Sequence, residues 1–164
     1  MTSTFRQRRR VEFYETDMAG IVHFSNFFRF MESTEHAFFR SLGLHLHHEG
    51  PDGESSGGMS GWARAAASCE FRAPLMYMDE VEIELTVREK RSSTISYDFE
   101  FTRVADRNGP IEPELSARGS LRVVHVTGVP GKHMKAVEMP ADVARLVEPA
   151  SAPAPAPARE GGTR

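Results

Sequence analysis

Three successive segments of the chain alternate between apolar and polar side chains, and this pattern constrains the fold more than any other feature. The segments are residues 64–72, 80–88 and 94–102. Because neighbouring residues of a strand point to opposite faces, a two-residue period indicates a strand with one face on a core, as in antiparallel sheets. The side chains predicted to face the core are Ala65, Ala67, Cys69 and Phe71 in the first segment, Val81, Ile83, Leu85 and Val87 in the second, and Ile95, Tyr97, Phe99 and Phe101 in the third.

A long helix is predicted over residues 26–42. Its stripe comprises Phe27, Met31, Thr34, Phe38 and Leu42 at helical spacing, widened by Phe28, Phe30, Ala37 and Phe39. A stripe this broad predicts a helix that is buried on most sides. Ser25 or Asn26 is predicted to cap its first turn, and Gly43 to end it.

Weaker patterns complete the order of elements. Residues 5–14 are predicted to form a first strand and residues 114–127 a last one, in which Gly119 marks a bulge or a close approach by another chain. Pro140 is predicted to open a short helix over residues 141–148. This order predicts an α+β domain in which an antiparallel sheet wraps around the long helix.

The length of 164 residues suits one domain with one core, expected over residues 1–148. Residues 149–164 are rich in alanine and proline, and they cannot bury enough apolar surface to offset the entropy of ordering them. A disordered tail without chemistry is therefore expected. Residues 50–61 form a loop of turn-forming residues, and its length predicts a mobile or functional segment.

Charge and cysteine content exclude several classes of function. The net charge of −3 does not fit a general nucleic-acid binder. The single cysteine, Cys69, allows neither an internal disulfide nor a cysteine-rich metal site, and it fits a reducing cytosol. No apolar run approaches the ~18 residues of a membrane span, and the basic start lacks the apolar segment of a signal peptide. A cytoplasmic protein is expected.

Residues 12–31 hold the side chains best suited to chemistry. Asp17 stands in a short turn, Gly20 follows it, and His23 precedes the aromatic helix. The first N–H groups of a helix have no intrahelical partner, so they can stabilise a developing oxyanion. A carboxylate beside such donors, between apolar walls, suits acyl-group chemistry. The alternative is that Asp17 only binds the local backbone of its turn.

This segment resembles the hotdog-fold acyl-CoA thioesterases of the 4-hydroxybenzoyl-CoA thioesterase family. The residues that carry the resemblance are Glu12-Phe13, Asp17, Ala19-Gly20-Ile21-Val22 and Asn26, followed by the aromatic helix. The resemblance continues more weakly through residues 58–90 and at Val137-Glu138-Met139-Pro140-Ala141, so it covers about residues 5–147.

The resemblance implies a hotdog fold and hydrolysis of an acyl-CoA to a carboxylic acid and coenzyme A. It implies that Asp17 attacks the thioester carbonyl or activates a water, and that the backbone N–H of Phe24 polarises the carbonyl oxygen. It also implies homodimers with active sites at the subunit interface, often paired into homotetramers. Coenzyme A is then part of the substrate, and no separate cofactor is expected.

Several residues near Asp17 are predicted to serve the substrate. Gly20 lets the turn approach it, and Phe27 supplies an apolar wall. Asn26 suits a helix cap as well as a substrate contact. Relatives often carry a histidine one position after His23, so an acid or base role for His23 and a structural ring bonded to backbone both stay open.

A second group of predicted substrate contacts lies further along the chain. Ser60 and Trp62 fall where the family lines the partner's active site, although Trp62 also suits an interface or a core. Arg88, Lys90 and Arg91 surround a turn where relatives often place basic residues against the coenzyme A phosphates. A solvated hairpin end explains these three equally well.

The cluster His45, His47 and His48, with Glu49 and Asp52 nearby, invites a metal interpretation. Its spacing matches no zinc motif, so no metal site is predicted. The chain also lacks the Gly-x-Ser-x-Gly motif of serine thioesterases. The alternatives to a thioesterase are a non-catalytic acyl or aromatic ligand-binding module and a hotdog enoyl-CoA hydratase or dehydratase. The aromatic residues favour either a ring or a fatty chain as the acyl group.

Overall fold

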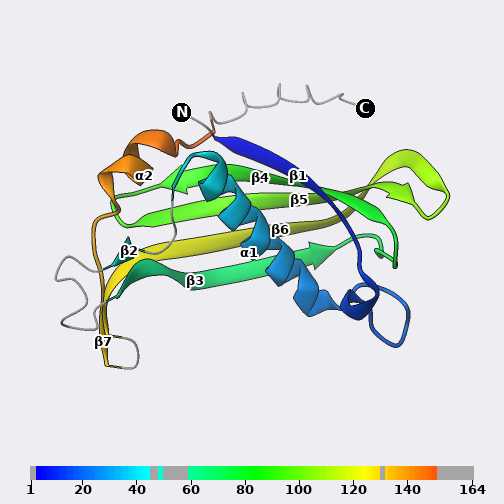
Figure 1. Ribbon diagram of the computed structural model, residues 1–164, viewed down its shortest axis with the longest axis horizontal. Coiled ribbons are helices and arrows are strands. Elements are labelled where there is room, and N and C mark those ends of the chain that lie inside the picture. Colours follow the sequence, from blue (N-terminus) through cyan, green and yellow to red (C-terminus); the bar gives the residue numbers. More distant parts are fainter. Residues whose placement is uncertain (1–2, 45–47, 50–58, 130–131, 151–164) are drawn as a thin grey trace, which may run out of the picture.

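Seven strands form one antiparallel sheet in the computed structural model, which describes residues 3–44, 48–49, 59–129 and 132–150. Along the chain they are β1 (Thr4–Arg10), β2 (His48–Glu49), β3 (Met59–Phe71), β4 (Glu80–Lys90), β5 (Thr94–Asp106), β6 (Gly109–Val129) and β7 (His133–Ala136). Their order in the sheet is β1-β4-β5-β6-β3-β2, and β7 pairs with β6 (Figure 1).

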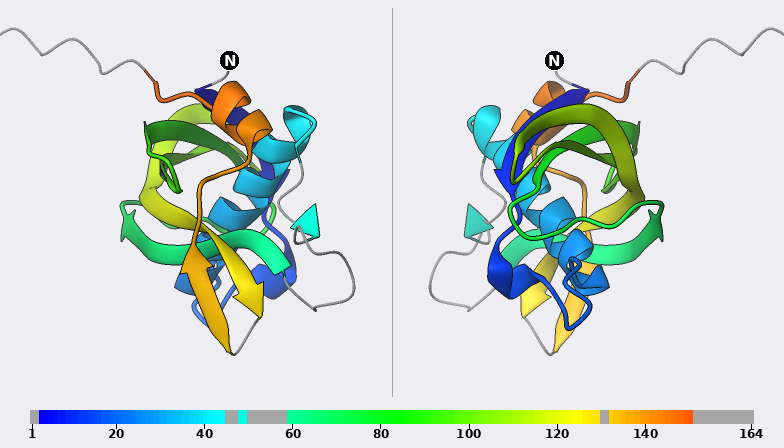
Figure 2. Two further views of the ribbon diagram at one scale, coloured as in Figure 1. Left: turned by 90° about the vertical axis from the view of Figure 1, so that its left-hand side faces the viewer. Right: turned by 90° about the vertical axis from the view of Figure 1, so that its right-hand side faces the viewer.

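One long helix, α1 (Phe24–Ser41), lies across one face of this sheet (Figure 1). Viewed from either side of the molecule, the strands curl around the helix (Figure 2). A 3-10 helix, η1 (Phe13–Glu15), precedes α1, and a short helix, α2 (Ala141–Leu146), follows the last strand. The predicted α+β architecture, a sheet wrapped around a long helix, is therefore confirmed.

Helix α1 buries two adjacent rows of side chains against the sheet. These are Asn26, Phe27, Phe30, Met31, Thr34, Glu35, Phe38 and Phe39. Burying an aromatic side chain such as Phe30 contributes roughly 1.5–3 kcal/mol relative to leaving it exposed. The far face carries exposed Arg29, Glu32 and Arg40. The prediction of a helix buried on most sides is thus wrong for the single chain, because charged residues occupy the far face.

Strands β4 and β5 supply the facing half of the core. The four alternate residues predicted to point inward from each strand are all buried, with exposed fractions of at most 1%. Phe101 of β5 meets Phe27 of α1 edge-on, with ring centres 5.2 Å apart. The period-two prediction is confirmed for both strands.

Strand β3 departs from the predicted alternation. Ala65, Ala67 and Phe71 are exposed, and Cys69 is half-buried. The register with β6 shifts after Arg64, which interrupts the alternation. The alternation of apolar and polar residues therefore predicted a strand correctly, but the prediction that its apolar residues face the core is wrong for the exposed ones.

Gly119 of β6 lies directly against the side chain of Met31 in α1. It pairs in regular register with Cys69 of β3 and Phe99 of β5, so the alternative of a bulge there is wrong. A Cβ atom at Gly119 would lie 2.5 Å from Met31 Sδ. The close approach is therefore made by the helix of the same chain.

Several element ends differ from their predicted positions. The first strand ends at Arg10, because the chain turns into η1 there. Strand β6 extends beyond the predicted 114–127, and α2 ends at Leu146 rather than at residue 148. Strand β7 escaped prediction because its four residues are all exposed and carry no apolar alternation. The predicted tail beyond residue 150 and most of the predicted loop at 50–61 lie outside the described residues.

Candidate active site

The turn that carries Asp17 is closed by a set of short-range hydrogen bonds. The Gly20 N–H donates to the Asp17 carbonyl oxygen at 3.0 Å, and the Asp17 N–H donates to the Ile21 carbonyl oxygen at 2.9 Å. Gly20 has a φ of 78°, a left-handed conformation that favours glycine. The Ala19 N–H donates to Asp17 Oδ1 at 2.8 Å. The Asp17 carboxylate therefore binds its own turn, while Oδ2 accepts no hydrogen bond from another described residue.

An ion pair between Arg9 and the buried Glu15 lies directly before this turn. Glu15 is 5% exposed and pairs with Arg9, whose guanidinium carbon lies 4.0 Å from the centre of the Phe30 ring. The Glu12 N–H donates to Glu15 Oε2 at 2.9 Å. The Asn26 side-chain amide donates to the Glu15 carbonyl oxygen at 2.7 Å. These contacts fix β1, η1 and α1 to one another directly before the turn.

Helix α1 begins at Phe24, with His23 as its N-cap. The Ser25 N–H donates to His23 Nδ1 at 3.4 Å, and Ser25 Oγ lies 2.8 Å from the same nitrogen. The prediction of Ser25 or Asn26 as the cap is wrong, because the helix starts two residues before Asn26. The Phe24 N–H occupies the first helical position, where no intrahelical acceptor exists. It makes no hydrogen bond to another described group.

The His23 ring caps the first turn of α1. It also packs on the Phe24 ring, with centres 4.5 Å apart. No hydrogen bond joins His23 to Asp17, both of which the structure describes. The geometry therefore gives His23 a structural task and does not place it against the carboxylate.

A pocket of about 390 Å³ opens beside the Asp17 turn. Asp17, Ile21, Val22, Phe24 and Phe27 line one side of it, and residues 71–75 line the other. Phe27 is 4% exposed and meets Phe71 edge-on, with ring centres 5.1 Å apart. Three residues predicted from the sequence, Asp17, Phe24 and Phe27, thus lie in one mainly apolar pocket, as is usual for ligand sites.

Residues 71–75, which join the end of β3 to the following loop, were not predicted to bind substrate. The Val22 N–H donates to the Leu75 carbonyl oxygen at 2.8 Å, so this loop is bonded to the Asp17 turn. Arg72 adds a cation to the pocket wall and pairs with Glu70 at 2.9 Å. The Ala73-Pro74 pair signals a turn in the sequence, but it carries no signal for this long-range contact.

Ser60 and Trp62 do not line this pocket in the described chain. Ser60 Oγ lies 2.8 Å from His125 Nε2, and both side chains are buried. The Trp62 ring packs between Phe39 and His125, with ring centres 6.0 and 5.1 Å away. The core interpretation of Trp62 is the one that the structure supports.

The predicted basic turn lies at the far end of β4 from Asp17. The Asp17 turn is bridged to Met76, just before β4, by Ile21. The 11 residues of β4 then separate it from Lys90 by about 33 Å, at roughly 3.3 Å per residue. The structure therefore does not bring these basic residues to the Asp17 of their own chain.

Each of the three basic side chains already has a partner. Lys90 Nζ donates to the carbonyl oxygens of Ala144 and Val147 at 2.6 and 2.7 Å, and so holds the end of α2. Arg88 pairs with Asp98 at 3.4 Å, and Arg91 pairs with Glu89 at 2.8 Å. A solvated hairpin end, the alternative interpretation, describes their present contacts.

Glu35 is a fully buried carboxylate in the middle of α1. Its Oε2 lies 2.6 Å from Arg64 Nη2. Burial raises the pKa of Glu35 to about 7, although the Arg64 charge opposes the rise. Burial, and then the Glu35 charge, raise the pKa of Tyr97 well above its usual value. Sequence analysis missed this group, because a glutamate in a helix normally indicates a solvent-facing position.

Within the described ranges, no three His, Cys, Asp or Glu side chains gather as metal ligands would. The cluster considered for metal lies outside what the structure describes, since His45, His47 and Asp52 and the side chains of His48 and Glu49 are not placed. No helix in the described part of the chain has the length and apolar character to span a membrane.

Comparison with known proteins adds three findings. A model of the thioesterase-like superfamily matches residues 11–147. A protein of Aquifex aeolicus (strain VF5), named an esterase only provisionally, is 37% identical over 95 residues, which are 58% of this chain and 70% of that protein. The 4-hydroxybenzoyl-CoA thioesterase of Pseudomonas sp. (strain CBS-3) is 25% identical over 149 residues, 89% of this chain and 99% of that protein.

Among solved structures, 4-hydroxybenzoyl-CoA thioesterase has the same fold. The comparison structure is an X-ray structure of an aspartate-to-asparagine mutant complexed with 4-hydroxybenzoyl-CoA. It superposes with a TM-score of 0.71 at 22% identity, and the match covers 90% of this chain and 100% of that one.

Proposed function

The chain belongs to the thioesterase-like superfamily, and we propose that it hydrolyses an acyl-CoA thioester to a carboxylic acid and coenzyme A. The observation that carries this proposal is that Asp17 and Phe24 line one apolar pocket. Asp17 brings a carboxylate oxygen without a hydrogen bond to another described residue, and Phe24 brings the first N–H of a long helix. These are a nucleophile or base and an oxyanion donor, the two groups that thioester hydrolysis needs.

In this proposal the thioester carbonyl oxygen lies against the Phe24 N–H. The negative charge that develops on this oxygen is stabilised by the N–H and by the positive end of the α1 dipole. Losing one such donor costs roughly 3 kcal/mol in other enzymes. The coenzyme A thiolate leaves readily, so no strong general acid is required, and we assign His23 to the helix cap alone.

Asp17 can act by one of two routes. In the first, a carboxylate oxygen attacks the thioester carbon, the C–S bond breaks, and water cleaves the resulting mixed anhydride. In the second, Asp17 takes a proton from a water that attacks the same carbon directly. A single turnover in oxygen-18 water separates them: label in the Asp17 side chain demonstrates the covalent route, and label confined to the product supports the general-base route.

We propose an aromatic acyl group. Phe24, Phe27 and Phe71 all line the pocket, and aromatic rings gain extra stability from edge-to-face packing on one another. The relative from Pseudomonas sp. is named for an aromatic acyl-CoA, which supports this choice. The relative that was solved with its CoA thioester carries an aspartate-to-asparagine substitution, which supports an aspartate at the reaction centre.

We further propose that two copies of the chain complete the site by pairing along β3. Beyond its short pairing with β2, the outer edge of β3 has no partner strand among the described residues. Unpaired N–H and C=O groups template another strand, and the exposed Ala63, Ala65 and Ala66 are small enough to let one approach. Phe71 and Arg72, at the end of the same strand, would place the second copy beside the pocket.

The other residues predicted to contact the substrate have different roles in this proposal. Gly20 and Asn26 act through the shape of the Asp17 turn, because Gly20 adopts a left-handed φ of 78° and the Asn26 side-chain amide donates to the Glu15 carbonyl oxygen. Arg88 and Arg91 could meet coenzyme A phosphates only at the site of a partner chain. Such exposed charges act through screened attraction, so their effect on KM should weaken as salt is raised.

Of the other predicted contacts, Ser60 stays a proposed contact of a partner's site, Trp62 is assigned to the core, and Lys90 is assigned to the end of α2. A cytoplasmic location rests on the single Cys69 and stays a prediction.

The proposed activity is tested by thiol release from a panel of acyl-CoAs. The panel contains benzoyl-CoA, 4-hydroxybenzoyl-CoA, acetyl-CoA, hexanoyl-CoA and palmitoyl-CoA. We expect the highest kcat/KM for the two aromatic substrates. Preference for palmitoyl-CoA would overturn the aromatic assignment but keep the thioesterase, and binding of acyl-CoA without any thiol release would show a ligand-binding module instead.

A further inference from the structure

The wall of the Asp17 pocket carries one cation. Among the described residues that line this pocket, Asp17 and Arg72 are the two charged side chains, and all the others are apolar. The backbone at Arg72 is anchored to β6, because the Arg72 and Ala73 N–H groups both donate to the Ser116 carbonyl oxygen, at 2.8 and 3.1 Å. The Arg72 side chain is 55% exposed. A fixed segment of backbone therefore presents an accessible guanidinium at the pocket.

The Arg72 guanidinium has hydrogen-bond donors that its own chain does not use. Its Nη2 donates to Glu70 Oε2 at 2.9 Å, while its Nε and Nη1 make no hydrogen bond to another described residue. A guanidinium carries five N–H donors. Glu70 is 73% exposed, and an ion pair between two such exposed side chains contributes little to stability. Arg72 can therefore bind an acceptor on a ligand without losing a strong contact.

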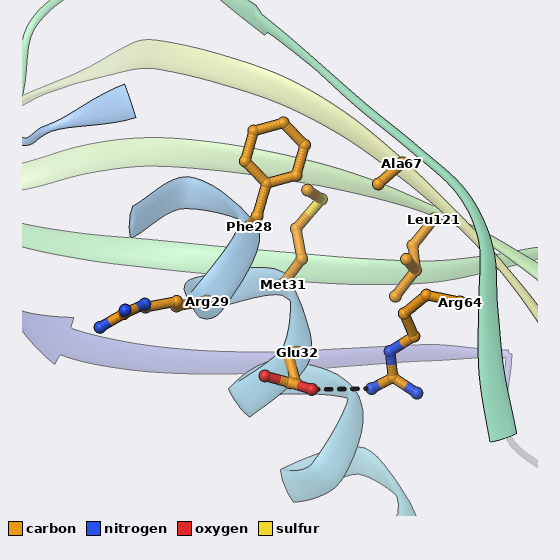
Figure 3. A pocket seen from close by; sticks show the side chains of 7 residues that line it. All are labelled: Phe28, Arg29, Met31, Glu32, Arg64, Ala67 and Leu121. Carbon is orange, nitrogen blue, oxygen red and sulfur yellow. Dashed lines mark hydrogen bonds and ion pairs between the residues drawn. The ribbon is translucent and has the colours of Figure 1, made fainter. Parts of the chain in front are cut away.

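A second hollow, of about 200 Å³, lies between α1 and β3, and an arginine borders it as well (Figure 3). The donors of this residue, Arg64, are already engaged by the protein. Its Nη2 lies 3.4 Å from Glu32 Oε1 and 2.6 Å from the buried Glu35 Oε2, and its Nη1 donates to the Trp62 carbonyl oxygen at 3.0 Å. Arg72 differs from Arg64 because it keeps unused donors at the wall of a pocket.

The coenzyme A part of the proposed substrate leaves the Asp17 pocket on its exposed side. Phe27 forms a buried wall of the pocket and is 4% exposed, whereas Arg72 belongs to the exposed wall. An apolar acyl group gains most at the buried wall, and the charged nucleotide of coenzyme A stays in water, because burying its charges would be costly. The pantetheine arm that joins the two parts therefore passes the exposed wall.

The length of the pantetheine arm determines which of its groups can meet Arg72. A sphere of 390 Å³ has a diameter of about 9 Å, which bounds the distance across the pocket. The carbonyl oxygen of the first amide is about five bonds from the thioester sulfur, or about 6 Å at roughly 1.2 Å per bond of an extended chain. The first phosphorus atom is about 13 bonds away, or about 16 Å. The first amide therefore lies within reach of the pocket wall, and the phosphates lie beyond it.

We propose that Arg72 is a substrate-binding residue that donates a hydrogen bond to the first amide carbonyl of the pantetheine arm. This inference rests on the proposed thioesterase function. A hydrogen bond from a charged donor is stronger than one between neutral groups. The amide does not change during the reaction, so this bond is equally strong in the ground state and in the transition state. It therefore lowers KM and leaves kcat unchanged.

The test uses three thioesters of one acyl group, which is benzoyl or whichever member of the acyl-CoA panel reacts best. They are the coenzyme A ester, the N-acetylcysteamine ester, which keeps only the first amide, and the ethyl ester, which has no amide. Thiol release gives kcat/KM for each ester in wild type and in Arg72→Ala. Because each ester is compared with itself in the two proteins, differences in intrinsic reactivity cancel.

We expect Arg72→Ala to lower kcat/KM by about tenfold or more for both esters that contain the amide. The loss on the coenzyme A ester should come mainly from a higher KM. For the ethyl ester, kcat/KM should change by less than about threefold, which also shows that the Asp17 site of the variant is intact.

Arg118→Ala is the matched control. Arg118 is 57% exposed and pairs with Glu100 at 2.9 Å, much as Arg72 pairs with Glu70, but it does not line the pocket. It should leave all three esters unchanged.

Equal losses on all three esters in Arg72→Ala, or no loss on any, would overturn the inference. A loss confined to the coenzyme A ester would place Arg72 at the nucleotide and overturn its assignment to the amide. Absence of thiol release by wild type from every member of the acyl-CoA panel would instead overturn the proposed function.

Discussion

The Asp17 side chain engages its own turn through Oδ1, which accepts the Ala19 N–H. The two interpretations of Asp17, a turn carboxylate and a catalytic group, therefore do not exclude each other. A carboxylate has two oxygens and can accept several hydrogen bonds. Local bonding through Oδ1 fixes the direction in which Oδ2 points, and preorganisation of this kind is what a reacting group requires.

Met78 offers a test of strain at the edge of the site. It is the one residue other than glycine with a positive φ, 73°, in the described part of the chain. A left-handed conformation costs roughly 1–2 kcal/mol for a residue with a Cβ. We predict that Met78→Gly raises the free energy of unfolding by about 1 kcal/mol in chemical denaturation. Met76→Gly, at a nearby exposed position without positive φ, should lower the free energy of unfolding. The same sign of change in both variants would contradict this account.

Glu35 gives the protein a specific dependence of stability on pH. Its pKa of about 7 in the folded chain exceeds the ordinary value of 4.5, so the native state binds the proton more tightly than the unfolded chain. The stability that this protonation contributes is complete below about pH 4.5 and is lost as the pH rises through 7. The full loss amounts to roughly 3 kcal/mol.

We predict that Glu35→Gln removes this pH dependence, because glutamine has a similar size and does not titrate. Urea unfolding of wild type and variant between pH 4.5 and 8 measures it. The free energy of unfolding of Glu35→Gln minus that of wild type should increase as the pH rises to about 7 and stay constant above it. A difference that stays constant over this range would contradict the assignment.

At the level of elements, the packing of α1 on the sheet determines the space between them. Met31 belongs both to the core and to the wall of a hollow of about 200 Å³ between α1 and β3. Gly119 leaves space for its thioether. The sequence indicated a bulge or a close approach by another chain at Gly119, whereas the element that approaches this glycine is α1 of the same chain.

We predict that Gly119→Ala lowers the free energy of unfolding by about 1 kcal/mol, because the added methyl group displaces the Met31 thioether. The Met31 thioether is flexible, so the loss of stability should be near the lower limit of what overpacking of a core usually costs. Thermal unfolding measures the loss. In the Met31→Ala background the added methyl group has space, so Gly119→Ala should cost nothing further there; an equal cost in both backgrounds would show that Met31 is not the obstacle.

Strand β3 shows that a two-residue alternation does not by itself predict burial. Alternation located β4 and β5 together with their buried faces, because both strands are central in the sheet. In β3 the same pattern accompanies exposed side chains, and a register shift after Arg64 interrupts it. Alternation reports which residues share a face, and burial depends on what packs against that face.

At the scale of the whole molecule, the sequence predicted the architecture and the family. The hotdog arrangement is confirmed by the structure, and the thioesterase family is confirmed by the match over residues 11–147. Long-range contacts were not predictable in the same way. The packing of residues 71–75 against the Asp17 turn and the burial of Glu35 against Arg64 depend on how distant elements meet.

The open edge of β3 leads to a prediction about assembly. We expect sedimentation equilibrium to give a mass of at least twice the 18.3 kDa of one chain. Backbone amides of alternate residues within 61–71 should then exchange slowly with solvent, because a second β3 accepts their hydrogen bonds. A fully active protein of 18.3 kDa, with fast exchange along this edge, would contradict the proposed pairing.

The most direct test of the account is the kcat of Asp17→Asn for 4-hydroxybenzoyl-CoA. Asparagine can still accept the Ala19 N–H, so the turn should persist and thermal stability should change little. Asp106→Asn is the matched control, because Asp106 Oδ1 makes the same kind of bond to the Asn108 N–H in a turn outside the pocket. We predict a loss in kcat of about 10²–10⁴-fold for Asp17→Asn and none for Asp106→Asn. A kcat for Asp17→Asn within about twofold of wild type would contradict the central claim that Asp17 performs the chemistry.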